Sequence, residues 1–352
     1  MSYRIFDVDQ HLCDTGIDFS PYVTKAANED LPRNVEYEGC QRLALGGRLF
    51  PKPTGFGRGS PSGSGAGGDL TWKERVSWSE EQNIGHALLL PGNVGMAIHA
   101  IEDIELYSQM AEGYRRWQLA NWADVKDKRF SVALLTDVHS LPTIAEAEHT
   151  AVSSLFIRPA NVKGTRFDSE DMKPLYRLAS DTGLPIVLHS STGYYQCSPV
   201  ANKYDNYFYT HLYSHIIEMQ IALGEILSSG VLEKYPDVRF VFAEAGVWWV
   251  PGFVERLIWH MKTFPSMILG DASKVLDLLY ERCLFCCQVE DISRISPLLM
   301  QNPWLRLGIG TDIPHWDAID PNLILSSLSA ADAYAVSWQN ASSIIFKGNA
   351  PL

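Results

Sequence analysis

The chain has little positive charge for its length. Its 352 residues include 29 Lys and Arg against 41 Asp and Glu, a formal net charge of −12. Proteins that bind nucleic acids generally present a basic face, so this balance argues against a nucleic-acid partner. No stretch is long and apolar enough to span a membrane, and no apolar signal region follows Met1. We therefore expect a cytoplasmic protein without a nucleic-acid or membrane partner.

The sequence also lacks a dense cysteine framework and a dinucleotide-binding motif. Its 6 cysteines are scattered, which favours free thiols over disulfides in a chain without a secretion signal. Cys283, Cys286 and Cys287 could form a metal or redox motif, but they lie in an apolar run and read better as small buried strand residues. No Gly-x-Gly-x-x-Gly follows a predicted strand at the start of a helix, which argues against dinucleotide binding.

Acidic and imidazole side chains are present at the first predicted strand, around residues 5–11. Because side chains alternate along a strand, Asp7, Asp9 and His11 are expected on one face. Burying such groups is costly unless they are paired or bind a metal ion. A hydrogen-bonded aspartate at a strand end is the simpler alternative, so the interpretation depends on the rest of the chain.

Strand and helix patterns alternate along the chain after this point. Further strands are predicted at 86–90, 130–135, 154–157, 185–188, 238–243, 284–289 and 305–310, most of them followed by a helix. Several are continuous apolar runs, which are typical of parallel strands buried on both faces. The pattern predicts an α/β fold, a (β/α)8 TIM-type barrel formed by one domain over residues 1–352. A doubly wound open sheet is the alternative.

One region does not fit this alternation. Residues 46–69 are rich in Gly, Ser and Pro and cannot form a core. They are interpreted as an inserted loop, either a disordered surface segment or a mobile cover over a site.

Ionisable residues recur where the predicted strands end. In a barrel of this type the active site lies at the C-terminal ends of the strands. The residues at those ends are Asp9, His11, Arg158, His189, Glu244 and Asp312. Each has an alternative role, such as Glu244 pairing with Arg158 or Asp312 capping a turn. Their convergence at one mouth favours a metal site.

A helix predicted over 210–229 adds a further candidate. Its register places His211, His215 and Met219 on one face. If this face packs on the barrel, His215 could be a ligand or have a structural role.

The strand ends resemble those of a known family. Asp-x-Asp-x-His at residues 7–11, His189, Ala-Glu-Ala-Gly at 243–246 and Asp-x-Pro-His-Trp-Asp at 312–317 are similar to the amidohydrolase-related group of the amidohydrolase superfamily. That group includes aminocarboxymuconate-semialdehyde decarboxylase. The segments 156–162, 183–189 and 230–236 are also similar. The resemblance implies the barrel fold and a metal-dependent enzyme, but no particular substrate.

The resemblance implies a ligand set. Asp9, His11, His189 and Asp312 stand at the family's metal-ligand positions. Two departures stand out: many members have His at the position of Asp9, and the decarboxylase has a catalytic His at the position of Glu244. Asp7 is interpreted as a supporting residue and not as a ligand.

The residues leave the metal and its number open. Asp9, His11, His189 and Asp312 suffice for one divalent ion, and adding Glu244 and His215 could complete a dinuclear centre. The set is rich in oxygen and contains no thiolate, so zinc, iron and manganese are all compatible.

Several functions follow from such a centre. In hydrolysis or non-oxidative decarboxylation, Asp312 would manage the proton, and Arg158 or His315 would orient a carboxylate of a small-molecule substrate. The candidate catalytic residues are therefore Asp312, Arg158, His315, Glu244 and His215. A dinuclear iron or manganese–iron oxygenase is the alternative, and a non-catalytic metal-bearing subunit is a third interpretation.

Two further expectations concern partners and substrate. The family resemblance implies a homo-oligomer or pairing with a homologous subunit. Aromatic residues near the predicted mouth could bind an apolar compound or simply pack in the core. These residues are Tyr194, Tyr195, Trp248, Trp249 and Trp316.

Overall fold

The structure is a computed structural model of the chain. It describes residues 3–24, 28–37, 39–50, 70–122, 127–160, 164–190, 198–200, 203–204, 207–315 and 317–347. Most of the predicted Gly/Ser/Pro-rich insert, residues 51–69, lies outside the described residues, as do Tyr194, Tyr195 and Trp316.

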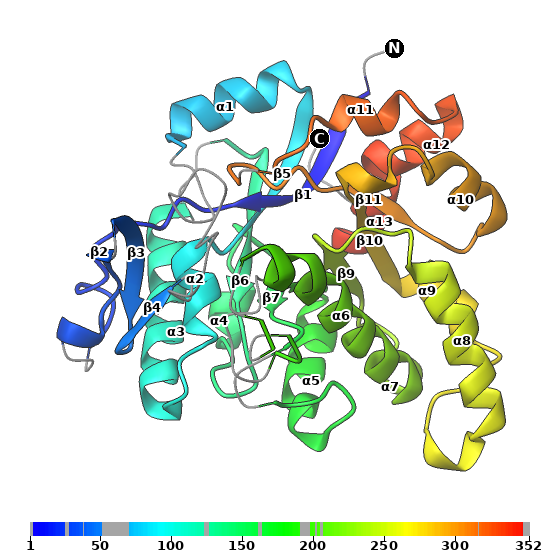
Figure 1. Ribbon diagram of the computed structural model, residues 1–352, viewed down its shortest axis with the longest axis horizontal. Coiled ribbons are helices and arrows are strands. Elements are labelled where there is room, and N and C mark those ends of the chain that lie inside the picture. The colour runs from blue at the N-terminus through cyan, green and yellow to red at the C-terminus, as the bar shows by residue number, and fades with distance from the viewer. Residues whose placement is uncertain are drawn as a thin grey trace.

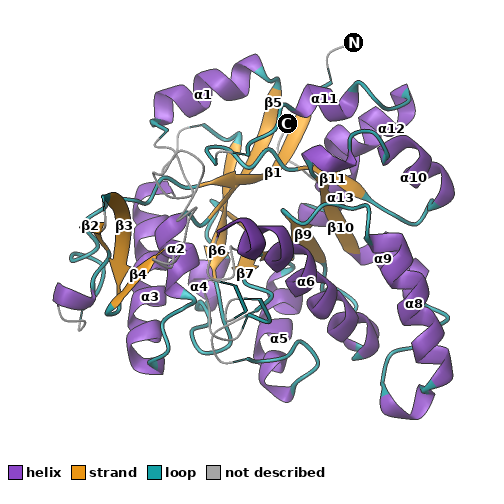
Figure 2. Ribbon diagram, viewed as in Figure 1, coloured by secondary structure: helices purple, strands orange, loops and turns teal. Residues whose placement is uncertain are grey.

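Eight parallel strands of the described chain close into a barrel, in the order β1-β11-β10-β9-β8-β7-β6-β5. They are β1 (Ile5–His11), β5 (Ile84–Leu90), β6 (Phe130–Leu135), β7 (Val152–Ile157), β8 (Ile186–His189), β9 (Phe240–Ala243), β10 (Cys283–Cys287) and β11 (Leu307–Ile309). Helices surround these strands (Figure 1, Figure 2). The prediction of a (β/α)8 barrel is confirmed.

The helices follow the strands in the expected alternation. They are α1 (Trp72–Glu81), α2 (Asn93–Ile98), α3 (Ile104–Trp122), α4 (Ile144–Ala147), α5 (Lys173–Thr182), α6 (Tyr207–Ser228), α7 (Val231–Lys234), α8 (Val250–Thr263), α9 (Val275–Arg282), α10 (Ile295–Gln301), α11 (Pro321–Leu325), α12 (Ala330–Tyr334) and α13 (Asn340–Ile345). A π-helical segment, Ala335–Gln339, joins α12 to α13.

Local sequence explains where some helices begin and end. At α1, Oγ1 of Thr71 accepts a hydrogen bond from the main-chain N–H of Glu74, and the Glu74 carboxylate accepts one from the N–H of Thr71. Thr143 and Glu146 form the same capping box at α4, which therefore begins at Ile144. Helix α5 ends at Gly183, whose φ of 68° is in the left-handed region that favours glycine.

The barrel strands are apolar on both faces because helices cover the outside and side chains fill the inside. Every residue of β6, β9 and β10 is buried. Cys283, Cys286 and Cys287 are free thiols within β10, in agreement with their interpretation as buried strand residues. In the β8–β9 pairing, His189 is opposite Ala243. Glu244, the residue after Ala243, therefore lies at the C-terminal end of the barrel close to His189, the last residue of β8.

A small antiparallel sheet precedes the second barrel strand. It comprises β2 (Arg33–Tyr37), β3 (Cys40–Leu45) and β4 (Arg48–Phe50), in that order. It lies beside α2 and α3 (Figure 1), and Leu43, Leu45 and Phe50 join the hydrophobic core. The sequence pattern predicted no strand here, and β4 lies within the first residues of the predicted 46–69 insert. The strands of this sheet are short and partly exposed, so their sequence lacks a strong apolar alternation.

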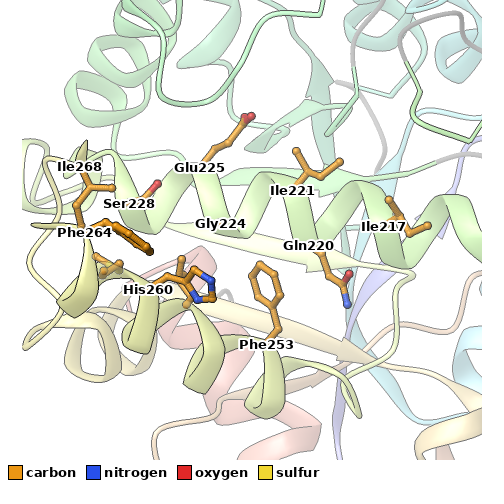
Figure 3. A pocket seen from close by; sticks show the side chains of 12 residues that line it. Ile217, Gln220, Ile221, Gly224, Glu225, Ser228, Phe253, His260, Phe264 and Ile268 are labelled. Carbon is orange, nitrogen blue, oxygen red and sulfur yellow. The ribbon is translucent and has the colours of Figure 1, made fainter. Parts of the chain in front are cut away.

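A groove lies on the outer surface, away from the strand ends. This open groove of about 470 Å³ lies between α6 and α8, lined by apolar side chains such as Ile221, Phe253 and Phe264 and by His260 (Figure 3). Within the ranges given above, no helix combines the length and the apolar character that crossing a membrane requires.

Candidate metal centre

Four buried side chains meet at the C-terminal mouth of the barrel. Asp9 and His11 come from β1, His189 ends β8, and Asp312 follows β11. One ligand atom from each lies within 4.8 Å of the others, and none of the four is more than 1% exposed. We call this set the β-strand cluster. Sequence reasoning had named all four residues.

Main-chain carbonyls orient the two histidines of the β-strand cluster. Nδ1 of His11 donates to the carbonyl oxygen of Pro91 at 2.7 Å, and Nδ1 of His189 donates to that of Ser190 at 2.5 Å. A carbonyl can only accept, so each Nδ1 carries hydrogen and each Nε2 is left to face the cluster. The two Nε2 atoms lie 3.2 Å apart. Main-chain acceptors commonly orient metal-binding histidines in this way.

The carboxylates of the same cluster face the imidazoles, and some of their oxygens lack a hydrogen-bond donor. Both oxygens of Asp9 and Oδ2 of Asp312 are buried with no hydrogen-bond partner. Oδ1 of Asp9 lies 3.3 Å, and Oδ1 of Asp312 3.2 Å, from Nε2 of His11. Buried acceptors in such contact need a proton or a cation between them. The residues therefore fit a divalent cation.

The electrostatics of the metal-free chain lead to the same conclusion. Burial lowers the pKa of His11, but the close carboxylates of Asp312 and Asp9 outweigh it and hold this pKa well above its usual range. Burial and the nearby charge of Glu244 raise the pKa of Asp312 well above its usual value. The cluster thus retains protons, which a cation could displace.

Asp7 holds the strand ends that carry these ligands. It is fully buried, and its carboxylate accepts from the N–H of Thr311 at 3.0 Å, from Oγ1 of Thr311 at 2.6 Å and from Nε2 of Gln10 at 2.8 Å. Asp7 therefore ties β1 to the segment just before Asp312, a supporting position as the sequence had indicated. A Cβ at Gly310 would lie only 2.8 Å from Cβ of Asp9, so glycine permits this close approach.

A second group of side chains lies next to the β-strand cluster. His211 and His215 on α6 and Glu244 after β9 each offer a ligand atom within 4.8 Å of the others. Oε2 of Glu244 lies 3.0 Å from Nε2 of His215 and 3.0 Å from Nε2 of His189. We call His211, His215 and Glu244 the helix cluster. Sequence reasoning had placed His211 on the right helix face without selecting it as a site residue.

Charges within the helix cluster shift its pKa values in opposite directions. Burial raises the pKa of Glu244, but the positive charges of His215 and His189 outweigh it and hold this pKa well below its usual value. Burial lowers the pKa of His215, but the negative charge of Glu244 outweighs it and raises this pKa to about 9. Glu244 also has a left-handed backbone, with φ of 50°, a costly conformation that is concentrated at functional sites.

His315 completes the solvent-facing side of the mouth. Its Nδ1 lies 2.6 Å from Oδ1 of Asp312, and its ring stacks on that of His11 at 4.1 Å. Burial and the charge of His11 lower the pKa of His315 to about 4. Nε2 of His211 lies 3.4 Å from Oδ2 of Asp317 on the same side.

Arg158 directly follows β7, at the strand end that the sequence had predicted. Its side chain is fully buried, and its guanidinium lies 3.7 Å from Oε2 of Glu218 on α6. Burial lowers the pKa of Arg158 to about 9, although the charges of both Glu218 and Glu244 oppose this shift. Oγ of Ser198 donates to Oε1 of Glu218 at 2.6 Å. Sequence reasoning missed Glu218, although it lies three residues after His215 and thus on the same helix face.

The two described aromatic residues near the mouth differ. Trp248 is 43% exposed, whereas Trp249 is 5% exposed and donates its indole N–H to the carbonyl of Ala245. Trp249 therefore packs in the core, and only Trp248 of this pair is available to a ligand.

Comparisons with known proteins extend this description. The family model described as Amidohydrolase matches residues 79–342. Among curated proteins no match is found.

Several solved structures share the fold. An amidohydrolase from Mycobacterium avium subsp. paratuberculosis K-10 has a TM-score of 0.76 and 17% identity, covering 98% of this chain and 100% of that chain. The 5-carboxyvanillate decarboxylase from Sphingomonas paucimobilis has a TM-score of 0.63 and 14% identity, covering 79% of this chain and 83% of that chain.

A third structure contains a metal and a ligand. The 5-carboxyvanillate decarboxylase from Novosphingobium aromaticivorans DSM 12444, with bound manganese and 3-methoxy-4-hydroxy-5-nitrobenzoic acid, has a TM-score of 0.62 and 15% identity. The match covers 79% of this chain and 81% of that chain. Identities this low establish a shared fold and nothing more specific.

Proposed function

The chain belongs to the amidohydrolase family, and from this premise we propose that it is a divalent-metal-dependent enzyme that removes a carboxylate group from a small aromatic acid without an oxidant. The observation that carries the proposal is the β-strand cluster, in which fixed imidazole nitrogens and unpartnered carboxylate oxygens face one another. The solved relatives that are decarboxylases support the reaction, and the manganese and nitrobenzoate in one of them support the substrate class.

Asp9, His11, His189 and Asp312 would hold the ion. Two nitrogen and two carboxylate donors suit zinc, manganese and iron. A divalent cation at this position would polarise substrate oxygen atoms and lower the pKa of water. The remaining chemistry falls to side chains of the mouth.

Asp312 and His315 are positioned to move the proton. In decarboxylation the bond between the ring carbon and the carboxylate breaks, carbon dioxide leaves, and the ring carbon takes a proton. His315 contacts Oδ1 of Asp312 and its side chain is 12% exposed, so the pair connects the buried cluster to a substrate in the mouth. A positioned acid or base of this kind typically contributes about 10²–10⁴-fold in rate.

Other residues hold the surroundings in place. Arg158 is fully buried against Glu218, so we assign it to positioning α6 and not to binding a substrate carboxylate. His211 and Trp248 reach solvent at the mouth and would contact an aromatic acid there, with Trp248 offering a ring face.

Oxygenation is the second candidate function, and the helix cluster is the observation that favours it. Two-metal sites can be bridged by a carboxylate, and Glu244 lies between His189 and His215. Insertion of one oxygen atom from dioxygen would require an external two-electron donor.

The test is a metal analysis followed by substrate assays on the purified protein. We expect a bound divalent ion, loss of activity on chelation, recovery on adding back Mn²⁺ or Zn²⁺, and carbon dioxide release from hydroxylated benzoates. Asp312→Asn should lower kcat by about 10²–10⁴-fold. Glu281→Gln, an exposed carboxylate on α9, is the control and should leave kcat unchanged.

Four results would contradict the proposal. A protein that binds no metal, or an Asp312→Asn variant with unchanged turnover, would refute the site. Hydrolysis of amides or lactones without carbon dioxide release would replace decarboxylation by hydrolysis. Oxygen uptake that depends on a reductant and an aromatic acid would establish the oxygenase.

A further inference from the structure

We propose that Asp291 is a positioning residue of the mouth, whose carboxylate fixes the loop between β9 and α8 and thereby sets where Trp248 meets an aromatic substrate. The inference rests on the proposed function, which assigns to Trp248 the contact with an aromatic acid, and it adds what holds that side chain in place. Asp291 lies just after β10, in the short 3₁₀ turn Val289–Asp291. The loop comprises residues 244–249, between the end of β9 and the start of α8.

The Asp291 carboxylate binds main-chain N–H groups from two segments of the chain. Its Oδ1 accepts from the N–H of Trp248 at 3.0 Å, and its Oδ2 accepts from the N–H of Gln288 at 2.9 Å. The N–H of Val247 is shared, at 3.1 Å from Oδ1 and 3.0 Å from Oδ2. Asp291 is 1% exposed, so water does not compete for these bonds. Successive N–H groups turned towards one anion form a concave site that fixes the backbone around it.

The backbone of this loop is strained and needs such support. Glu244 and Gly246 both have a left-handed backbone, with φ of 50° and 64°. A Cβ at Gly246 would lie 2.9 Å from Oε1 of Glu290 and 3.4 Å from Oδ2 of Asp291, so glycine lets the loop pass this closely. A left-handed residue other than glycine persists only where the surrounding contacts hold it. The loop N–H groups that Asp291 binds supply contacts of this kind.

The loop connects the metal-binding side of the mouth to its substrate side. Glu244 begins it, with Oε2 3.0 Å from Nε2 of His189. Trp249 ends it and packs in the core, whereas Trp248 is 43% exposed. Trp248 is therefore the large side chain that the loop presents to solvent. The position of its ring relative to His189 follows from the loop conformation that Asp291 fixes.

The simpler alternative is that Asp291 only stabilises the fold by binding these N–H groups. Asp14 offers the comparison, because it is also 1% exposed and its carboxylate accepts from the N–H groups of Val94 and Gly95, at 3.0 Å each. Asp14 holds α2, to which the proposed function assigns no substrate contact. A change from aspartate to asparagine at both positions therefore separates a general loss of stability from a specific effect on Trp248.

The first measurement follows Trp248 itself and needs no substrate. Burial raises the pKa of Asp291 to about 6, so the full-length protein is studied with Mn²⁺ present at about pH 8, where Asp291 is ionised. Its 10 tryptophans are replaced by 5-fluorotryptophan, and the ¹⁹F resonance lost in Trp248→Phe is that of Trp248. Asp291→Asn should shift or broaden this resonance, because the new amide group brings N–H donors against main-chain donors. Asp14→Asn should leave it unchanged, and the other tryptophan resonances report whether each variant is folded.

The second measurement is carbon dioxide release from 2-hydroxybenzoate and from the dihydroxybenzoates. Asp291→Asn should raise KM by about 10-fold, the size of one aromatic contact, and leave kcat within roughly 2-fold of the wild-type value. Trp248→Ala should raise KM to a similar extent. The double variant should be no worse than Trp248→Ala alone, because Asp291 acts through Trp248. Asp291→Glu, which keeps the charge on a longer side chain, should recover part of the loss.

The outcomes separate this inference from the proposed function. An unchanged Trp248 resonance in folded Asp291→Asn would overturn the inference, as would a fall in kcat without a rise in KM, or KM effects that multiply in the double variant. Failure of both Asp291 variants to fold would assign the carboxylate to stability alone and would also overturn it. A Trp248 resonance moved by Asp291→Asn, in a protein that releases no carbon dioxide from any of these acids, would overturn the proposed function and leave the positioning of Trp248 by Asp291 standing.

Discussion

At the N-terminal end of the barrel, His86, Ser131, Ser153 and Arg239 are buried polar side chains that make hydrogen bonds to one another or to the main chain. Nε2 of His86 on β5 lies 2.8 Å from Oγ of Ser131 on β6, which lies 2.7 Å from Oγ of Ser153 on β7. Arg239, next to the start of β9, donates to main-chain carbonyls of Gly183 and Ile344.

At the C-terminal end, buried carboxylates lack such partners. Both oxygens of Asp9 and one of Asp312 have no donor, and Glu244 and Asp312 both have left-handed backbones, with φ of 50° and 60°. Unpaired buried charges and strained backbone both cost stability. The same barrel therefore uses polar groups for stability at one end and keeps them available for a cation at the other.

The comparison predicts that changes at the two ends have different readouts. Changes at the mouth should alter the stability that depends on cations, and changes near His86 should alter stability whether or not a cation is present.

The largest expected effect is that of Asp9→Asn. The variant loses a negatively charged metal ligand, which should weaken Mn²⁺ binding by at least about 10³-fold. This exceeds the 10–100-fold loss that is typical when a residue that only hydrogen-bonds to a ligand is changed. In the wild-type protein, Mn²⁺ at 100 times its Kd should stabilise the fold by about 2.7 kcal/mol, and in the variant this increment should vanish. Calorimetry measures the Mn²⁺ affinity, and thermal unfolding with and without Mn²⁺ measures the stabilisation. A variant still stabilised by Mn²⁺ would remove Asp9 from the ligand set.

Acid should destabilise the fold through His86. Burial and the charge of Arg4 lower its pKa from 6.5 to about 4, so the folded chain keeps His86 neutral. As pH falls from 6.5 towards 4, the unfolded chain takes up a proton that the folded chain does not, and stability falls by up to ~3 kcal/mol. Urea unfolding across this range in the presence of chelator measures the loss.

His86→Gln should remove that part of the pH dependence. His99, whose pKa burial lowers to about 3, acts in the same direction and would retain its own contribution. His260→Gln is the control and should leave the wild-type slope. A His86→Gln variant with the full wild-type slope would contradict the assignment.

Asp7→Asn should have an intermediate effect on cation binding. The variant keeps one acceptor oxygen but loses charge, so the tie between β1 and Thr311 weakens and the ligands of the β-strand cluster become less well positioned. We expect Mn²⁺ affinity to fall by about 10–100-fold. Asp14→Asn, an equally buried aspartate that caps α2, is the matched control and should lower stability with little change in affinity. Equal affinity losses in the two variants would show that Asp7 has no special role.

The smallest effect is expected for Ser131→Ala. This change leaves Nε2 of His86 and Oγ of Ser153 without their shared partner, which should cost about 1–3 kcal/mol of stability. Mn²⁺ affinity should be unchanged, because the serine lies at the other end of β6. A measurable loss of Mn²⁺ affinity would show that the two ends are coupled.

Much of the fold was predictable from sequence because it depends on local patterns. Apolar runs marked the barrel strands. The sheet β2–β4 was missed because its short strands gain stability from packing against the barrel rather than from their own pattern. Helix α9 was also missed.

The sequence by itself placed Asp9, His11, His189, Glu244 and Asp312 at the ends of strands, because strand ends are local features and parallel strands of a closed barrel end at one mouth. Only the tertiary structure decided which atoms meet. It paired Arg158 with Glu218, set Glu244 between His189 and His215, and brought His211 to the mouth. These contacts depend on how α6 packs over the strand ends, and the register of residues far apart in the chain is set by packing and not by local sequence.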